Sequence, residues 1–520
     1  MRLADLKVIL YAPVAQMVER KIEDLSVKGS NPFGSTNMVD VAQLAEHRVV
    51  AAGVESSNLS VHPKGYRIAA IAPVSKTGER KLHVGSSPTA PAKRAKRKRR
   101  KKGMDNENIV IKPITEVCLN VTEACNLACR YCFTEHNPNY MTLDIAKDAA
   151  KWLYNNAQEA TKIKGKEVVP TIGFFGGEPT LMWDTVIVPL VNWIKDQNWT
   201  FNLGITSNCV LMTQDKVDFL VENNMGLLLS MDGNKNTQDY NRPCKNNIKS
   251  SFDIVDKNLN YIAQKLPNTT YRATIIPATA EYLFENLMYA GNKGFANVFA
   301  IINEFEEWDE KARKIVEREI NKYALYVIDT FRRGEKNFVK LRPFEQAINK
   351  IVSINQAVVF VKDIEHIGPG DHHRCGLGDG YGSINYKGDI FACQEVASRK
   401  GEKDIFYIGN IYDGIDENRL QSLRNSFLNR PQKVFNHLNK NKCINCPSRF
   451  VCNANFCHVN NYILYQNFAE IPDCWCWWNN LLLEKAQMVL EILGYHQNEA
   501  FKDYFIDSIT QQGGPLHYDD

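Results

Sequence analysis

The stretch EVCLNVTEACNLACRYCF, residues 116–133, decides which fold and chemistry the sequence predicts. Its first part is a strand-like run, and we expect a β-strand over Glu116–Val121. Three cysteines follow directly, with the spacing Cys125-x3-Cys129-x2-Cys132. Three thiolates on one short loop can bind three irons of a cubane cluster and leave its fourth iron open to another ligand. A zinc site usually needs four protein ligands, or three with histidine or carboxylate partners, and this loop offers none at zinc-finger spacing.

Further strand-like runs follow this stretch and alternate with amphipathic helical patterns. The helices predicted between them include Thr142–Asn156 and Gln214–Asn224. Such alternation is typical of repeated βα units. We therefore expect an α/β fold, a partial (β/α)6 TIM-like barrel of parallel strands, with its chemistry at the C-terminal ends of the strands. The other predicted strands are Thr171–Phe175, Phe201–Thr206, Gly226–Met231, Tyr271–Ile276 and Val298–Ile302.

Length and composition are those of a globular protein. The chain has 520 residues, of which 44% are hydrophobic and 23% are charged. No stretch approaches eighteen uninterrupted apolar residues, and the N-terminus lacks the apolar core and cleavage site of a signal peptide. We therefore predict a cytoplasmic protein with no membrane partner. The 14 cysteines are better explained as metal ligands than as disulfides.

The net charge of +4 hides a split along the chain. Residues 1–103 hold 20 Lys and Arg against 8 Asp and Glu, and the remaining residues hold 43 against 51. The basic prefix also carries a repeat, because Val14–Arg20 recurs in similar form as Val41–His47. These copies resemble transfer-RNA gene arms translated in frame, so we expect residues 1–103 to be an irregular, disordered read-through segment and the natural protein to start at Met104. The alternative is a basic arm that binds nucleic acid or directs nuclear import.

Glycine-rich and polar motifs stand at the ends of the predicted strands. Gly176-Gly177-Glu178-Pro179 follows the second strand, Thr206-Ser207-Asn208 ends the third, and Ser230-Met231-Asp232-Gly233 ends the fourth, before Asp239 and Arg242. Together with the cysteine triad and its aromatic Tyr131, they resemble the motifs of the radical S-adenosylmethionine (SAM) superfamily over roughly residues 114–305. Glycines in such a motif let the backbone approach a charged amino-acid group closely.

The resemblance implies a [4Fe-4S] cluster on Cys125, Cys129 and Cys132, whose open iron binds the amino and carboxylate groups of SAM. The reduced cluster would cleave SAM to methionine and a 5′-deoxyadenosyl radical. In this interpretation the glycine motif holds the amino end of SAM, Tyr131 lies near the adenine and Ser230 contacts the ribose or carboxylate. Arg242 and Arg272 would neutralise the carboxylate of SAM, unless they are surface residues or form structural ion pairs. The implied cofactor residues are Tyr131, Gly176, Gly177, Glu178, Pro179, Asn208, Ser230, Asp232, Arg242 and Arg272.

A second group of cysteines lies in the C-terminal part. Its pattern, with Gly388 five residues before Cys393, resembles the SPASM extension of radical SAM enzymes, a small cysteine-rich α+β domain with two auxiliary iron–sulfur clusters. It departs from that pattern by one extra residue between Cys452 and Cys457 and by one extra cysteine at the end. Eight thiolates are enough for two further four-iron clusters. These are Cys375, Cys393, Cys443, Cys446, Cys452, Cys457, Cys474 and Cys476.

The SPASM resemblance also suggests ligand sets. The outer cluster would use Cys443, Cys446, Cys452 and either Cys474 or Cys476. The inner cluster would use Cys375, Cys393 and Cys457, with a fourth position taken by the remaining cysteine, Asp371, His372 or His373, or left open. The alternative is one or two zinc sites, because C-x2-C pairs commonly bind zinc. Cys118, Cys209 and Cys244 fall outside both groups and are expected to be inert thiols.

The predicted organisation is a barrel over 104–305, a helical bridge over 306–370, the SPASM domain over 371–480 and a C-terminal helix and tail over 481–520. Enzymes with this arrangement mostly modify peptides or proteins. We therefore predict a maturase that acts on a small precursor peptide, forms a thioether or another cross-link, and takes electrons from a flavodoxin or ferredoxin. Candidate bases are Glu395 and Asp389, although each is more commonly an ordinary surface carboxylate.

Two alternatives remain open from the sequence. One is an anaerobic sulfatase-maturating enzyme, against which Phe175 and Gln394 count, because that subgroup is expected to carry a polar and an acidic residue there. The other, from a different class, is a zinc-ribbon nucleic-acid binder, which predicts zinc, salt-dependent binding and no SAM cleavage. We expect no nucleic-acid partner, because the basic charge lies in the prefix and the body is acidic.

Overall fold

The computed structural model describes residues 112–507, with gaps at 246–249, 357–376, 398, 400–403, 429–445, 447, 449–456, 469 and 495–496. The predictions for residues 1–103 and for a start at Met104 lie outside the described residues. Eleven strands of the described part form one sheet in the order β11-β10-β9-β8-β1-β2-β3-β4-β5-β6-β7. The strands are β1 Glu116–Thr122, β2 Thr171–Gly176, β3 Asn202–Ser207, β4 Gly226–Ser230, β5 Thr270–Ile275, β6 Asn297–Ile302, β7 Lys340–Leu341, β8 Tyr381–Ile384, β9 Asp389–Phe391, β10 Tyr407–Asn410 and β11 Gly414–Ile415.

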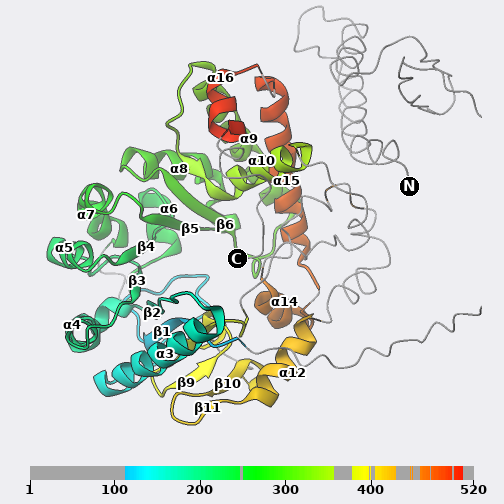
Figure 1. Cartoon of the computed structure of the whole chain (residues 1–520). Helices are drawn as coiled ribbons and strands as arrows, with labels where there is room; N and C mark the ends of the chain where they lie inside the picture. The colour runs from blue at the N-terminus through cyan, green and yellow to red at the C-terminus, as the bar shows by residue number, and fades with distance from the viewer. Residues whose placement is uncertain are drawn as a thin grey trace, which may run out of the picture. The chain divides into compact units, whose positions relative to one another are not determined.

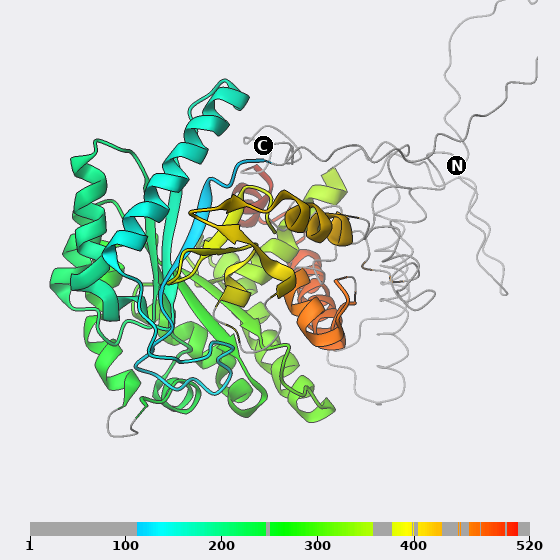
Figure 2. The same cartoon turned by 90° about the horizontal axis from the view of Figure 1, so that it is seen from below.

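The strands from β1 to β6 are the six strands that the sequence predicts, each within one residue at either end. They pair in parallel, and helices cover their outer face (Figures 1 and 2). The predicted α/β fold of a partial, parallel barrel is therefore confirmed. The helices along this part of the chain are α3 Leu143–Lys164, α4 Val188–Asp196, α5 Gln214–Glu222, α6 Lys235–Asn241, α7 Ser251–Lys265 and α8 Leu283–Asn292.

Helix α3 begins where the sequence predicts but continues eight residues further. Thr142 caps its start, because the hydroxyl accepts a hydrogen bond from Ile145 N at 3.3 Å. It ends at Gly165, which adopts the left-handed conformation with φ of 66°. The glycine, rather than the last strongly apolar residue, sets the end of the helix.

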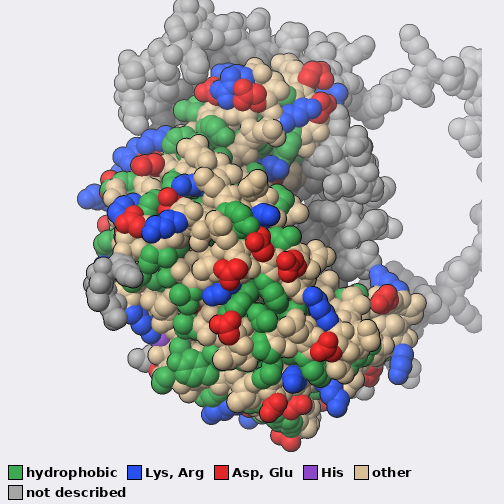
Figure 3. All heavy atoms as spheres, turned by 90° about the vertical axis from the view of Figure 1, so that its left-hand side faces the viewer, with side chains coloured by type: hydrophobic (Ala, Val, Ile, Leu, Met, Phe, Trp, Pro, Cys, Tyr) green, Lys and Arg blue, Asp and Glu red, His purple; other side chains and the backbone are tan. Residues whose placement is uncertain are grey.

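The barrel strands bury the side chains of one face, and the other face carries polar or half-buried side chains such as Asn120 and Cys118. On β1, Val117, Leu119 and Val121 are buried toward the helix layer, and β5 shows the same alternation with Tyr271 and Ala273. The intervening side chains face the inside of the barrel. The outer surface of the helix layer mixes Lys and Arg with Asp and Glu around small apolar areas (Figure 3). The inner face is therefore the side of the sheet on which a site can form.

The C-terminal strands do not form a separate sheet. Strand β8 pairs in parallel with β1, from Glu116 opposite Tyr381 to Leu119 opposite Ile384, and β9, β10 and β11 continue as an antiparallel meander. β1 would otherwise be an open edge with unpaired backbone groups, and β8 covers it. The sequence pattern did not reveal this pairing, because alternation within a strand does not identify its neighbour.

Long helices lie in the described residues of the predicted bridge and of the C-terminal part. Helix α15 packs against both α9 and α10, as Figure 1 also shows. Trp308 contacts Trp477 with ring centroids 5.5 Å apart, and Arg313 forms a 3.2 Å ion pair with Asp473. No helix among the described residues is long and apolar enough to cross a membrane. The helices are α9 Glu310–Arg332, α10 Arg342–Gln356, α11 Gln394–Ala397, α12 Glu417–Leu428, α14 His458–Tyr465, α15 Asp473–Leu493 and α16 Glu499–Phe501.

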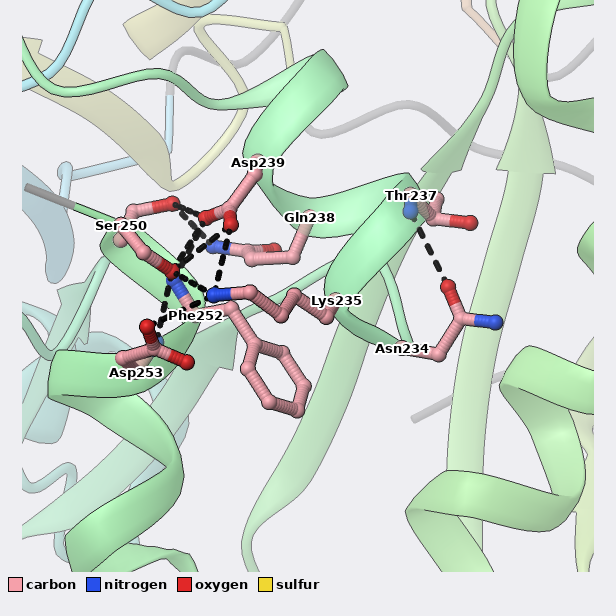
Figure 4. A network of polar contacts seen from close by, with 9 residues as sticks. Asn234, Lys235, Thr237, Gln238, Asp239, Ser250, Phe252 and Asp253 are labelled. Carbon is pink, nitrogen blue, oxygen red and sulfur yellow. Dashed lines mark hydrogen bonds and ion pairs between the residues drawn. The ribbon is translucent and has the colours of Figure 1, made fainter. Parts of the chain in front are cut away.

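A polar network joins α6 to the start of α7 (Figure 4). The Asp239 carboxylate accepts hydrogen bonds from Ser250 Oγ at 2.7 Å and from Phe252 N at 2.9 Å. Lys235 Nζ lies 3.2 Å from Asp239 and 2.6 Å from Asp253. Asp239, which follows the fourth predicted motif, therefore stabilises a helix N-terminus in this structure.

We expect Asp239→Ala to lower the free energy of unfolding by about 0.5–2 kcal/mol, because the first turn of α7 loses a backbone acceptor. Urea unfolding followed by circular dichroism measures this change. The control Asp253→Ala removes only an exposed ion pair and should cost about 0–1 kcal/mol.

The contribution of Asp239 to the free energy of unfolding should also depend on pH. Burial raises the pKa of this carboxyl, but its hydrogen bonds and Lys235 outweigh burial, so the pKa lies below its usual value. A lowered folded-state pKa gives stabilisation that is present above the unfolded-state pKa, about 3.9, and is lost as the pH falls through the folded-state value. A difference between wild type and Asp239→Ala that stayed constant down to the most acid pH would contradict this assignment.

Candidate active site

The loop with Cys125, Cys129 and Cys132 starts at the C-terminal end of β1, and the glycine motif after β2 holds it there. Gly177 N donates to Thr122 O and Glu178 N donates to Ala124 O, both at 2.9 Å. A Cβ atom on Gly177 would lie 2.3 Å from Ala124 O, closer than real Cβ contacts allow. The structure thus shows the glycine in close contact with the cysteine loop itself, a neighbour that the sequence analysis did not foresee.

The other side of the loop is held by the segment that follows α6. Ala128 N donates to Pro243 O at 2.8 Å, and Arg130 N donates to Asn241 O at 2.9 Å. Leu127 forms an isolated β-bridge with Cys244. The three cysteines therefore lie on a loop that is held on two sides, by the glycine motif after β2 and by the end of α6 with the residues that follow it.

Glu178 links the ends of β2 and β3. Its carboxylate is buried and accepts hydrogen bonds from Thr180 N and Oγ1, Ser207 Oγ and Asn208 N, at 2.6–3.1 Å. Burial raises the pKa of this carboxyl, and the four hydrogen bonds oppose the rise. These partners use most of the acceptor capacity of a carboxylate. In this structure the Glu178 side chain orders the strand ends, and its predicted contact with SAM stays a prediction.

Asp232 at the end of β4 joins the cysteine loop to β5. Its carboxylate is fully buried, accepts a 2.6 Å hydrogen bond from Tyr131 Oη and lies 3.0 Å from Arg242 Nη2. It also accepts from Asn241 Nδ2 at 2.9 Å and from Thr274 N at 3.0 Å. Arg242 thus forms a buried ion pair, as the sequence analysis allowed, while its Nε has no hydrogen-bond partner. Burial raises the pKa of Tyr131 well above its usual value.

The cysteine side chains differ in exposure. Cys125 and Cys129 are half-buried and Cys132 is exposed. Burial raises the pKa of both Cys125 and Cys129 to about 12, so neither thiol ionises at neutral pH without a positive partner. Metal binding supplies such a partner, because the ligand is the deprotonated thiolate. No three His, Cys, Asp or Glu side chains in the described part converge on a point that could hold a single metal ion.

The donor set fits a cluster in which each cysteine binds a different iron. Cys125 Sγ accepts a hydrogen bond from Leu127 N at 3.4 Å, and Asn208 Nδ2 lies 3.8 Å away. His136 Nε2 lies 3.5 Å from Cys132 Sγ. The sequence analysis named Asn208 but missed His136, whose only sequence signal is its position four residues after Cys132.

Other predicted residues lie on the inner face of the barrel or near it. The Arg272 guanidinium packs over Phe299 at 4.7 Å and donates to Phe299 O at 3.3 Å, and burial lowers its pKa. Glu395 on α11 interacts electrostatically with Arg272 and Arg399, which oppose the rise in its pKa caused by burial. Ser230 is half-buried at the end of β4, and Pro179 is buried at the start of a 3₁₀ turn.

Asp389, the other predicted base, has structural partners. Its carboxylate accepts hydrogen bonds from Asn385 Nδ2 at 3.1 Å and from Asn410 Nδ2 at 3.0 Å. These contacts fasten the β8–β9 turn to β10. Of the two predicted bases, Glu395 is the carboxylate that interacts electrostatically with Arg272, and its role as a base stays a prediction.

Only part of the second cysteine group is described. Cys375, Cys443 and Cys452, with Asp371, His372 and His373, lie outside the described residues. Cys393 is buried after β9, Cys446 and Cys457 are half-buried, and Asn460 N donates to Cys457 Sγ at 3.4 Å. Cys474 and Cys476 lie in the first turn of α15, and burial raises the pKa of Cys474 to about 11. The ligand sets of the auxiliary clusters stay predictions.

Three features define the class of this protein: a parallel α/β barrel, three cysteines after its first strand and a glycine motif after its second. Residues 119–290 match the family model of the radical SAM superfamily. This part of the chain therefore carries a radical SAM domain, which confirms the predicted resemblance.

Individual relatives support this assignment. The radical SAM cyclopropyl synthase TigE of Paramaledivibacter caminithermalis is 23% identical over 353 residues, which cover 64% of this chain and 66% of TigE. A cysteine-type anaerobic sulfatase-maturating enzyme of Clostridium novyi is 29% identical over 168 residues, covering 30% of this chain and 40% of that enzyme. The chain thus spans less than two thirds of these relatives' own length. The solved structure of anSMEcpe with bound AdoMet has a TM-score of 0.54 at 18% identity, covering 73% of this chain and 99% of that one.

We expect Gly177→Ala to destabilise the protein by about 1–3 kcal/mol or more, because the new methyl group overlaps Ala124 O and must displace the cysteine loop. The amount of iron that the variant binds after anaerobic reconstitution should also be lower than in the wild type. The control is Gly226→Ala, whose Cβ would meet nothing nearer than 3.9 Å. Equal iron content in the two variants would contradict the role of the close approach.

We expect Glu178→Gln to lower the free energy of unfolding by about 1–3 kcal/mol, because the amide NH2 cannot accept the hydrogen bonds that one carboxylate oxygen now accepts. Denaturant unfolding measures the change. Asp184→Asn is the matched control, since it makes the same kind of change at an exposed carboxylate shortly after the motif. An unchanged stability of Glu178→Gln would show that the four hydrogen bonds contribute little.

Proposed function

We propose that this protein is a radical SAM maturase that cleaves SAM reductively and modifies a ribosomally made peptide, with a thioether or another cross-link as the product. The observation that carries the proposal is the fixed three-cysteine loop at the end of β1, joined to the glycine motif and to Asp232. Cys125, Cys129 and Cys132 would hold a [4Fe-4S] cluster. When bound, that cluster supplies the electron that cleaves SAM.

The inner face of the barrel offers groups that can orient a substrate. Arg272 and Glu395 are half-buried side chains of opposite charge that interact electrostatically, and we propose that they orient a substrate. Tyr381 Oη donates to Cys118 Sγ at 3.3 Å on the same face. Glu395 is the base we favour over Asp389.

A peptide substrate has support from the fold relative. anSMEcpe has also been solved with bound AdoMet and the Cp18Cys peptide, and its chain aligns over nearly all of its length. We propose a small precursor peptide as the substrate of the present chain, a flavodoxin or ferredoxin as its electron donor and two auxiliary iron–sulfur clusters in the C-terminal part.

Sulfatase maturation is the second candidate. The Clostridium novyi relative favours it. Phe175 and Gln394 count against it, and Gln394 is hydrogen-bonded to Tyr381 Oη rather than free to act in place of an acid. A sulfatase-derived peptide that gains a formylglycine would decide for this candidate, whereas a cross-linked precursor peptide decides for the first.

The test is anaerobic reconstitution followed by addition of dithionite and SAM. We expect the wild type to produce 5′-deoxyadenosine and Cys125→Ala to produce at least about 100-fold less. The reason is that a cluster without one of its three cysteine ligands would not present the open iron that binds SAM. Chromatography with mass detection quantifies the product.

The matched control is Cys244→Ala, which removes a thiol outside both predicted ligand sets, keeps the backbone bridge to Leu127 and should retain cleavage. Cys125→Ala activity equal to wild type, or protein that holds zinc and produces no 5′-deoxyadenosine, would overturn the proposal. The second result would favour the zinc-ribbon alternative.

A further inference from the structure

One imidazole lies beside the cysteine triad without being one of its members. His136 Nε2 is 3.5 Å from the sulfur of Cys132, the most exposed of the three cysteine residues. Two other donors, Leu127 N and Asn208 Nδ2, lie near the sulfur of Cys125. Hydrogen bonding around the triad is therefore provided by different residues at different sulfurs.

The segment that carries His136 returns to the strand from which the cysteine loop started. Thr122 Oγ1 donates to Asn139 O at 2.8 Å, and Glu123 N donates to the same oxygen at 3.0 Å. Met141 N donates to Val121 O at 2.8 Å. The chain between Thr122 and Asn139 is thus a closed loop, tied at its base to the C-terminal end of β1.

A buried carboxylate at the start of this loop binds the residues that follow the histidine. Glu123 is 5% exposed, and its Oε2 accepts hydrogen bonds from Asn137 Nδ2 at 3.2 Å and from Asn139 Nδ2 at 2.7 Å. The backbone turns at this point, with Asn137 N donating to Glu135 O at 3.0 Å. The backbone on either side of His136 is therefore held by hydrogen bonds, and this support fixes the position of the imidazole beside the sulfur.

We propose that His136 is a positioning residue that donates a hydrogen bond from Nε2 to the Cys132 sulfur of the radical SAM cluster and raises the reduction potential of that cluster. The inference rests on the proposed function, because it requires the cluster to be present. A metal-bound thiolate carries no proton, so the imidazole must be the donor. Donation to a cluster sulfur stabilises the additional negative charge of the reduced state, and the reduction potential rises in consequence.

The experiment is an anaerobic redox titration of the reconstituted full-length protein, followed by electron paramagnetic resonance. The relevant signal is the one that changes when SAM is added, which separates this cluster from any auxiliary cluster. We expect His136→Ala to shift the midpoint potential to a more negative value. His136→Gln keeps an N–H donor and should restore part of the shift. Tyr140→Phe, an exposed residue of the same loop, should leave the potential unchanged.

A His136→Ala potential equal to wild type, with the iron content and the SAM-responsive signal intact, would overturn this inference and leave the proposed function standing. If His136→Ala does not bind iron, the inference is tested on the wild-type protein labelled with ¹⁵N-histidine. A histidine ¹⁵N coupling in the pulsed spectrum of the SAM-responsive signal supports the hydrogen bond, and its absence overturns it. A wild type with no SAM-responsive signal would overturn the proposed function, and this inference with it.

Discussion

The site depends on the close approach of two backbones at the ends of β1 and β2. Two hydrogen bonds, from Gly177 N to Thr122 O and from Glu178 N to Ala124 O, place the start of the cysteine loop on the glycine motif. A side chain at Gly177 would occupy the space of the Ala124 carbonyl. Because Cys125 is the next residue, the position of the first thiol follows directly from this backbone contact.

Two buried carboxylates extend this arrangement to the neighbouring strands. Glu178 links β2 to β3 and Asp232 links β4 to β5 and to Tyr131 of the loop, and each accepts several hydrogen bonds. A buried charge is costly unless it is paired or hydrogen-bonded, so these contacts stabilise one arrangement of the strand ends over others. The motifs that resemble those of the superfamily therefore also act within this chain as connections between strands.

The strands, the fold class and the family could be predicted from the sequence, because period-2 alternation and the cysteine spacing are local properties. The neighbours of each residue could not. Only the structure shows that Arg242 pairs with Asp232, that Asp239 stabilises the start of α7 and that Asp389 fastens a turn. His136 was missed because the contact with Cys132 depends on a loop that closes on β1. The join of β8 to β1 was missed because the alternation within each strand does not show which strand pairs with which.

By itself, the sequence determined that the barrel strands alternate with helices, that three cysteines follow the first strand, and that positive charge is concentrated before residue 104. Only the tertiary structure decided which groups surround those cysteines. Parallel strands bring their C-terminal ends to one edge of the sheet, so residues more than a hundred positions apart, such as Tyr131 and Asp232, become hydrogen-bonded partners. The chemistry of each side chain is fixed by its identity, but its burial and its donors are set by the neighbouring strand ends.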